Sequence, residues 1–84
     1  TKKSHFFDNF RKVVGMIKEQ VGKRIRQLRK RMGFSQETLA NLCELDRTYI
    51  TSVECGKRNI SIVNLEKITI ALKVSLAEFF TFED

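Results

Sequence analysis

Two short apolar patterns, separated by a few residues, constrain this chain more than any other feature. In the segment 34–56, Leu39 and Ala40 share one face of a predicted helix, and Ile50 and Val53 share one face of the next. The small Ala40 lets two helices approach closely, as a crossing of about 90–120° requires. The segment therefore predicts two short helices that cross steeply at a tight turn.

Capping residues mark the ends of these two helices. Ser35 is suited to cap a helix over 35–43, with Thr38 three residues later in place of the Glu or Gln of a full capping box. We expect the Asp46 carboxylate to accept backbone N–H groups at the start of the second helix. Gly56 is expected to end that helix in a left-handed conformation.

Helical spacing recurs on both sides of this segment. Before it, a helix that stops at Gly33 buries apolar residues at steps of three and four, which are Val21, Ile25, Leu28 and Met32. The polar residues between them are expected to face water, namely Lys23, Arg24, Arg26, Gln27, Lys30 and Arg31. After it, Ser61 and Ser75 open two helices whose inner positions are Leu65, Ile68, Leu72, Leu76, Phe79 and Phe80. With no proline and four glycines, an all-α chain is expected.

The first twenty residues carry another stripe at helical spacing, interrupted by Gly15, which consists of Phe6, Phe10, Val13 and Ile17. It predicts an additional N-terminal helix, so we divide the chain into an N-terminal extension over 1–17 and a domain over 18–84. Phe6, Phe7 and Phe10 beside basic residues also fit a membrane-surface helix. Packing on the domain or on a second copy of the chain explains these aromatic residues more simply.

Charge and cysteine content narrow the function classes. The 16 basic and 10 acidic residues give a net charge of +6, which favours a polyanionic partner such as nucleic acid. Eleven basic residues lie within 1–33, whereas 60–84 holds four acidic and two basic residues. Cys43 and Cys55 lack metal-ligand spacing and are expected to be reduced thiols, with Cys43 in the core. With no membrane-spanning run and no signal-peptide pattern, a cytoplasmic protein is expected.

Several motifs in register cover residues 18–80. They are Ile25-Arg-Gln-Leu-Arg29, Ser35-Gln-Glu-Thr-Leu-Ala40, Tyr49-Ile50 and Glu54-Cys-Gly-Lys-Arg58, followed by Leu65, Leu72 and Phe79. Together they resemble the lambda repressor and Cro type of helix-turn-helix, the Xre-like family. The resemblance implies a compact five-helix lambda-repressor-like DNA-binding domain, here with an additional N-terminal helix.

Two segments, 45–52 and 58–61, are especially similar to the controller proteins of restriction-modification systems. That similarity implies a sequence-specific regulator of transcription that binds double-stranded DNA through the major groove. It also implies a homodimer on a two-half-site operator, because one recognition helix reads only about four to six base pairs. We expect the last two helices to form the dimer contact, with Phe82 assigned to it.

The candidate DNA-binding residues lie on and around the second helix of the pair. Arg47 is the strongest candidate, because a guanidinium can pair bidentately with guanine O6 and N7. Gln36 is expected to hold a phosphate oxygen at the start of the preceding helix. Tyr49 can pack beneath the helix or reach a phosphate or a thymine. The full set is Gln36, Arg47, Thr48, Tyr49, Thr51, Ser52, Lys57, Arg58 and Asn59.

Three further residues have expected structural roles. Arg29 and Glu54 resemble the family's internal ion pair between the first and third helices of the domain. Glu44 stands in the turn where the family most often has glycine. A left-handed conformation at a non-glycine residue there costs about 1 kcal/mol.

Other function classes fit less well. No nucleophile with a nearby base, no paired-carboxylate motif and no phosphate-binding glycine loop is present, so neither an enzyme nor a metal or other cofactor is predicted. RNA binding is not favoured, because the sequence has no aromatic residues at the spacing of a β-strand that could stack on bases. An antitoxin-like or phage-type repressor remains an alternative, with a protein partner bound through the N-terminal extension.

Overall fold

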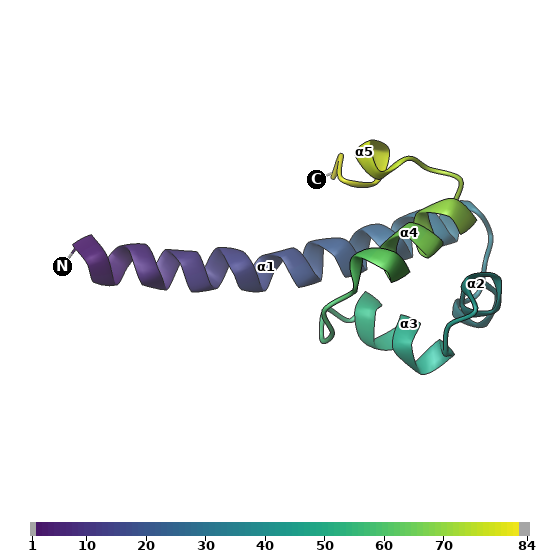
Figure 1. The fold of residues 1–84 in the computed structure, drawn as a ribbon, viewed down its shortest axis with the longest axis horizontal. Helices are drawn as coiled ribbons and strands as arrows, with labels where there is room; N and C mark the ends of the chain where they lie inside the picture. The colour runs from purple at the N-terminus through teal and green to yellow at the C-terminus, as the bar shows by residue number, and fades with distance from the viewer. Residues whose placement is uncertain (1, 83–84) are drawn as a thin grey trace.

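The computed structural model describes the backbone of residues 2–82 and the side chains in that range except those of 2–8 and 11–14. The described residues form five helices and no strand, which confirms the all-α class. The helices are α1 (Lys2–Arg31), α2 (Gln36–Cys43), α3 (Arg47–Glu54), α4 (Ile62–Ala71) and α5 (Leu76–Phe79) (Figure 1). Within the described part of the chain, no helix is both long and apolar enough to span a membrane.

The additional N-terminal helix is the first half of α1 and not a separate element. α1 runs without a break through Gly15, because a single glycine costs a helix only about 1 kcal/mol relative to alanine. The other four helices gather around its second half, and its first half projects away from them (Figure 1). The molecule is therefore elongated, with extents of 49 × 24 × 20 Å.

The core forms between the second half of α1 and the four shorter helices. Its buried residues include nearly all the predicted apolar positions, and they are Val21, Ile25, Leu28, Leu39, Ala40, Cys43, Ile50, Val53, Leu65, Ile68, Leu72 and Phe79. Met32 and Phe82 are only partly buried against this core. The prediction that Leu76 and Phe80 lie inside is wrong, since they are 47% and 46% exposed. A single helical turn can direct only one side to the core, and Phe79 occupies that side.

The prediction that Arg24 faces water is also wrong, because this residue is buried. Its Nε donates to the carbonyl oxygen of Phe79 at 2.9 Å, and its Nη2 donates to that of Glu78 at 2.7 Å. Carbonyl groups at a helix C-terminus lack intrahelical partners and attract a cation. Arg24 therefore fastens the short α5 to α1.

The helix starts follow the predicted caps, with one correction. The side-chain oxygens of Ser35, Ser61 and Ser75 each accept a backbone N–H three residues later. Asp46 occupies the N-cap of α3, but its side chain makes no capping hydrogen bond. The Asp46 side chain is exposed and borders the open depression on this side of α3.

A residue in the left-handed conformation follows each of α1, α2 and α3. Gly56 follows α3 with φ 73°, as predicted, and Gly33, where the first helix was predicted to stop, has φ 75°. Glu44 follows α2 with φ 56°, and the next amide, that of Leu45, donates to the Ala40 carbonyl at 2.9 Å. The α2–α3 turn therefore places a non-glycine residue in a conformation that favours glycine.

Replacing Glu44 by glycine should raise the free energy of unfolding by up to about 1 kcal/mol, because the left-handed strain disappears. Urea denaturation of the wild type and of Glu44→Gly measures this difference. Glu44→Ala is the matched control, since it removes the same charge and retains the strain. Equal stabilisation by alanine and glycine would show that the carboxylate, and not the backbone, is responsible.

Candidate nucleic-acid interface

α3 rests on α1 through its apolar side and through a close backbone approach. Ile50 and Val53 are almost fully buried beneath it. At Gly22 of α1, a Cβ atom would lie 2.2 Å from the Val53 carbonyl oxygen and 2.9 Å from that of Glu54. Only glycine fits there, and the sequence analysis did not single it out. The sequence offers one indication of this close approach, which is a glycine directly beside the apolar stripe of a predicted helix.

A hydrogen-bonded network joins α1, α2 and α3 at the C-terminal end of α3. Arg29 donates from Nε and Nη2 to the two carboxylate oxygens of Glu54 at 2.7 and 2.9 Å, which confirms the predicted ion pair. A third donor, Nη1, reaches the Phe34 carbonyl at 2.9 Å. The hydrogen bonds to Glu54 raise the pKa of Arg29 above its ordinary value, against the opposing effect of burial. Arg29 therefore stays protonated, and its ion pair with Glu54 holds α3 against α1.

Gln36 extends this network to the outer side of α3. Its Nε2 donates to Glu54 at 3.2 Å, and the Thr51 hydroxyl lies 3.0 Å from its Oε1. The same hydroxyl is 3.0 Å from the Arg47 carbonyl oxygen. Gln36 is thus held at the first turn of α2, where backbone N–H groups are unpaired within the helix. Thr51, predicted on the base-reading face, is half-buried, and its hydroxyl contacts Gln36 and the Arg47 carbonyl oxygen.

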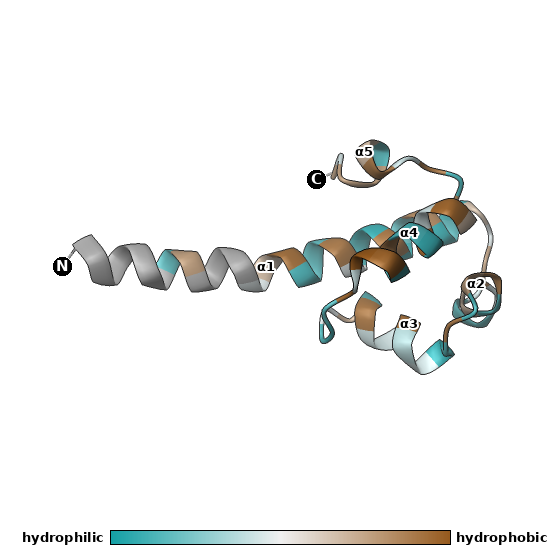
Figure 2. Ribbon diagram, in the orientation of Figure 1, coloured by the Kyte–Doolittle hydropathy of each residue, from teal (hydrophilic) through white to brown (hydrophobic). Residues whose placement is uncertain are grey.

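The remaining polar residues of α3 are open to solvent at its N-terminal end. Arg47 and Thr48 are exposed, and Ser52 is half-buried one turn later. Figure 2 shows α3 hydrophilic at this end and more hydrophobic toward the end that meets α1. Beyond α3, the three consecutive residues Lys57, Arg58 and Asn59 are all exposed. The end of α3 that lies far from its anchor is therefore its most accessible part.

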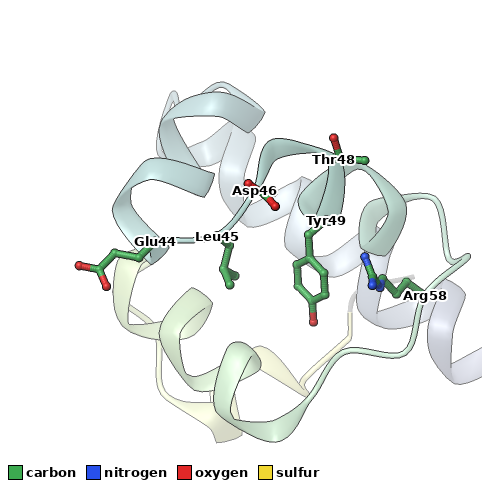
Figure 3. Close-up of a pocket in the computed structure, with 6 residues that line it drawn as sticks. All are labelled: Glu44, Leu45, Asp46, Thr48, Tyr49 and Arg58. Atoms are coloured by element: carbon green, nitrogen blue, oxygen red, sulfur yellow. The ribbon is translucent and has the colours of Figure 1, made fainter.

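Tyr49 lies on a different side of α3 from Thr48 (Figure 3). Its ring is partly buried against the core, and the Arg58 guanidinium carbon lies 4.9 Å from the ring centre. This is cation–π geometry. The two residues border an open depression of about 520 Å³ with Glu44, Leu45, Asp46 and Thr48. Tyr49 thus packs against the core, and the Arg58 guanidinium packs on the Tyr49 ring.

α2 and α3 pack against each other at a steep angle, with α2 seen nearly end-on in the view that shows α3 lengthwise (Figure 1). Together with the exposed N-terminal end of α3, this arrangement defines a helix-turn-helix domain. The model of the helix-turn-helix family matches residues 25–79. The chain belongs to this family.

Within the family, the chain is similar to proteins that control restriction-modification systems. It is 48% identical to control protein C.MunI from a Mycoplasma species, over 77% of this chain and 89% of that protein. The crystal structure of controller protein C.AhdI from Aeromonas hydrophila matches with a TM-score of 0.75 and 46% identity, over 77% of this chain and 98% of that one. Controller protein C.Esp1396I, solved as a tetramer with its natural 35 base-pair operator, matches at 0.70 and 41%, over 75% and 83%.

Proposed function

We propose that this protein is a regulator of transcription of the restriction-modification controller kind, which inserts α3 into the major groove of an operator. The observation that carries the proposal is the exposure of Arg47 and Thr48 at the N-terminal end of α3. Side chains at that end of a recognition helix contact base edges. The similarity to a controller protein solved on its operator supports the same conclusion.

In this proposal the candidate residues divide by role. Arg47 reads bases, with Thr48 and Ser52 beside it on α3. Gln36, oriented by Glu54 and Thr51, presents the start of α2 to a phosphate, which positions the domain without reading sequence. Lys57 and Asn59 flank the sugar-phosphate backbone, and Arg58 joins them while it contacts Tyr49. The Thr51 hydroxyl supports Gln36 and contributes to binding indirectly.

The functional unit in this proposal is a homodimer joined by the last two helices. Five apolar residues of α4, of α5 and of the position directly after α5 are between 46% and 83% exposed, and they are Ile62, Val63, Ile70, Leu76 and Phe80. Large apolar side chains exposed in this number on one part of a small domain support an interface there. Phe82, previously assigned to the contact, is partly buried against the core and contributes only its outer side. The protein acts by binding alone, without catalysis, in the cytoplasm.

Arg47→Ala should weaken binding to the cognate operator by about 1–3 kcal/mol and leave binding to random DNA nearly unchanged, because it removes contacts to base edges. Lys57→Ala is the matched control. It should weaken both duplexes alike and reduce the slope of log affinity against log salt by about 0.9, as expected for one lost phosphate contact. Fluorescence titrations at several salt concentrations measure both effects. Equal losses on both duplexes for Arg47→Ala would refute its base-reading role.

A further inference from the structure

The short helix α5 depends on other helices for its position. It spans only the four residues Leu76–Phe79, and Phe79 is its one buried residue. A helix of a single turn does not persist by itself in water, because its nucleation is unfavourable. The Ser75 hydroxyl accepts the Glu78 amide at 3.0 Å, and the Glu78 carboxylate accepts the Ser75 amide at 3.3 Å. These bonds close the turn, but they do not orient it on the rest of the domain.

Arg24 of α1 supplies contacts that do orient α5. Its Nε and Nη2 donate to the carbonyl oxygens of Phe79 and Glu78 at 2.9 and 2.7 Å, and the residue is 6% exposed. Two donors of one planar guanidinium on consecutive carbonyls fix both the position and the direction of the chain at the end of α5. A buried guanidinium also costs free energy to desolvate, which an apolar side chain of similar size does not. Orientation, and not burial alone, therefore accounts for an arginine at this position.

The chain that Arg24 fixes leads directly into exposed apolar side chains. The Phe80 amide donates to the Leu76 carbonyl at 3.0 Å, so these two side chains lie one turn apart on the same side. Leu76 is 47% and Phe80 46% exposed. The Phe80 ring packs edge-on against Phe79, with centroids 5.1 Å apart, and against Phe82 at 5.9 Å. The direction of Phe80 is therefore set by Phe79, the residue whose carbonyl Arg24 binds.

The contacts of α1 with α5 and with α3 lie on different sides of α1. Gly22, which meets the backbone of α3, and Arg24 are two positions and thus about 200° apart around the helix. Figure 1 likewise shows α5 and α3 on opposite sides of α1. A change in the contact that holds α5 should therefore leave α3 in place.

We propose that Arg24 is a positioning residue for dimerisation, which holds α5 in the orientation that presents Leu76 and Phe80 to a second copy of the chain. This inference rests on the proposed function, in which the last two helices join the homodimer. Arg24 is buried, so it acts through the Phe79 and Glu78 carbonyls. Without the guanidinium, α5 loses its fixed direction, and the affinity of the folded domain for a second copy falls.

Sedimentation of Arg24→Met, without DNA and over a range of concentrations, tests the inference. Methionine keeps an apolar stem and removes the donors. The dissociation constant of the dimer should therefore rise at least about tenfold, as expected for the loss of hydrogen bonds from a charged group. Arg24→Lys retains the charge but not the two-pronged donor, so its dissociation constant should lie between those of Arg24→Met and the wild type.

A second measurement shows whether α3 is unaffected. A random DNA duplex one half-site long should bind Arg24→Met as tightly as it binds the wild type, because the phosphate contacts around α3 are unchanged. Val53→Ala is the matched control for a loss of stability, since Val53 is 1% exposed and belongs to α3, across α1 from α5. It creates a cavity in the core and should leave the dissociation constant of the dimer within about twofold of the wild type.

Phe80→Glu separates this inference from the proposed function, because it disrupts the dimer surface itself. A monomeric Phe80→Glu protein beside an Arg24→Met protein that dimerises like the wild type would overturn the inference and leave the proposed dimer intact. A dimer that survives Phe80→Glu would overturn the inference together with the proposed interface.

Three further results would overturn the positioning role of Arg24. Equal effects of Arg24→Met and Val53→Ala on the dissociation constant would do so, as would weaker binding of Arg24→Met to the random duplex, because the change would then act on the whole domain. If Arg24→Met lacks the helical circular dichroism of the wild type, Arg24→Lys carries the test alone. An Arg24→Lys dimer as tight as that of the wild type then overturns the inference, and a weaker one supports it.

Discussion

Glu54→Ala should lower the free energy of unfolding by about 3–5 kcal/mol, the usual cost of breaking a buried ion pair from one side. The Glu54 side chain is only 3% exposed, and its removal leaves the Arg29 side chain, which is 11% exposed, without its carboxylate partner. Small domains have a total stability of about 5–15 kcal/mol, so this variant should be close to unfolding at physiological temperature. Urea denaturation followed by circular dichroism measures the change.

The double variant Arg29→Met with Glu54→Leu is the control for this prediction. It removes both charges and restores apolar volume, so it should be considerably more stable than Glu54→Ala. A loss below about 1 kcal/mol in Glu54→Ala would show that water screens the pair as it screens surface ion pairs. In that case the burial of Ile50 and Val53 in the core would be the main support of α3.

Gly22→Ala should lower the free energy of unfolding by about 3 kcal/mol or more and should weaken DNA binding at the same time. The new Cβ would lie 2.2 Å from the Val53 carbonyl oxygen, so the backbone of α3 itself has to move. Overpacking of this kind usually costs about 1–3 kcal/mol, and here no side-chain rotation can relieve it. Thermal unfolding and operator titration measure the two effects.

Gly15→Ala in the same helix is the matched control. No atom lies within 4 Å of its Cβ position, so alanine should only improve helix propensity, by about 1 kcal/mol. A lower free energy of unfolding in Gly22→Ala and a higher one in Gly15→Ala would show that the loss arises in the α1–α3 contact. A Gly22→Ala protein as stable as the wild type would show that α3 can shift on α1 without cost.

The sequence predicted correctly those features that depend on neighbouring residues alone, such as helix ends and buried helix faces. The limits of α2 follow from Ser35 and from its apolar spacing, and Gly33 and Gly56 correctly marked two helix ends. The twelve buried apolar residues were also largely predicted, because helical periodicity reports directly which side is inside.

Features that depend on distant partners were not predicted. Arg24 has the spacing of a surface residue, and its partners Phe79 and Glu78 lie more than fifty positions away. Gly22 matters only because α3 crosses α1 at that point. In the candidate interface, exposure at Arg47 agrees with the helix pattern, whereas the engagement of Thr51 with Gln36 depends on how α2 and α3 pack.

α3 is anchored at its C-terminal end and exposed at its N-terminal end, the end that reads bases in the proposed function, and this separation has an evolutionary consequence. The C-terminal end carries Glu54 and the close approach to Gly22, and we expect substitutions of these two residues to affect folding. Arg47 and Thr48, at the other end, are exposed and can change with little effect on stability. In the proposed function, descendants of this chain can therefore acquire new operator preferences by single substitutions at these two positions, with little effect on folding. Two such descendants in one cell could bind different operators, each without affinity for the operator of the other, while they keep the same fold.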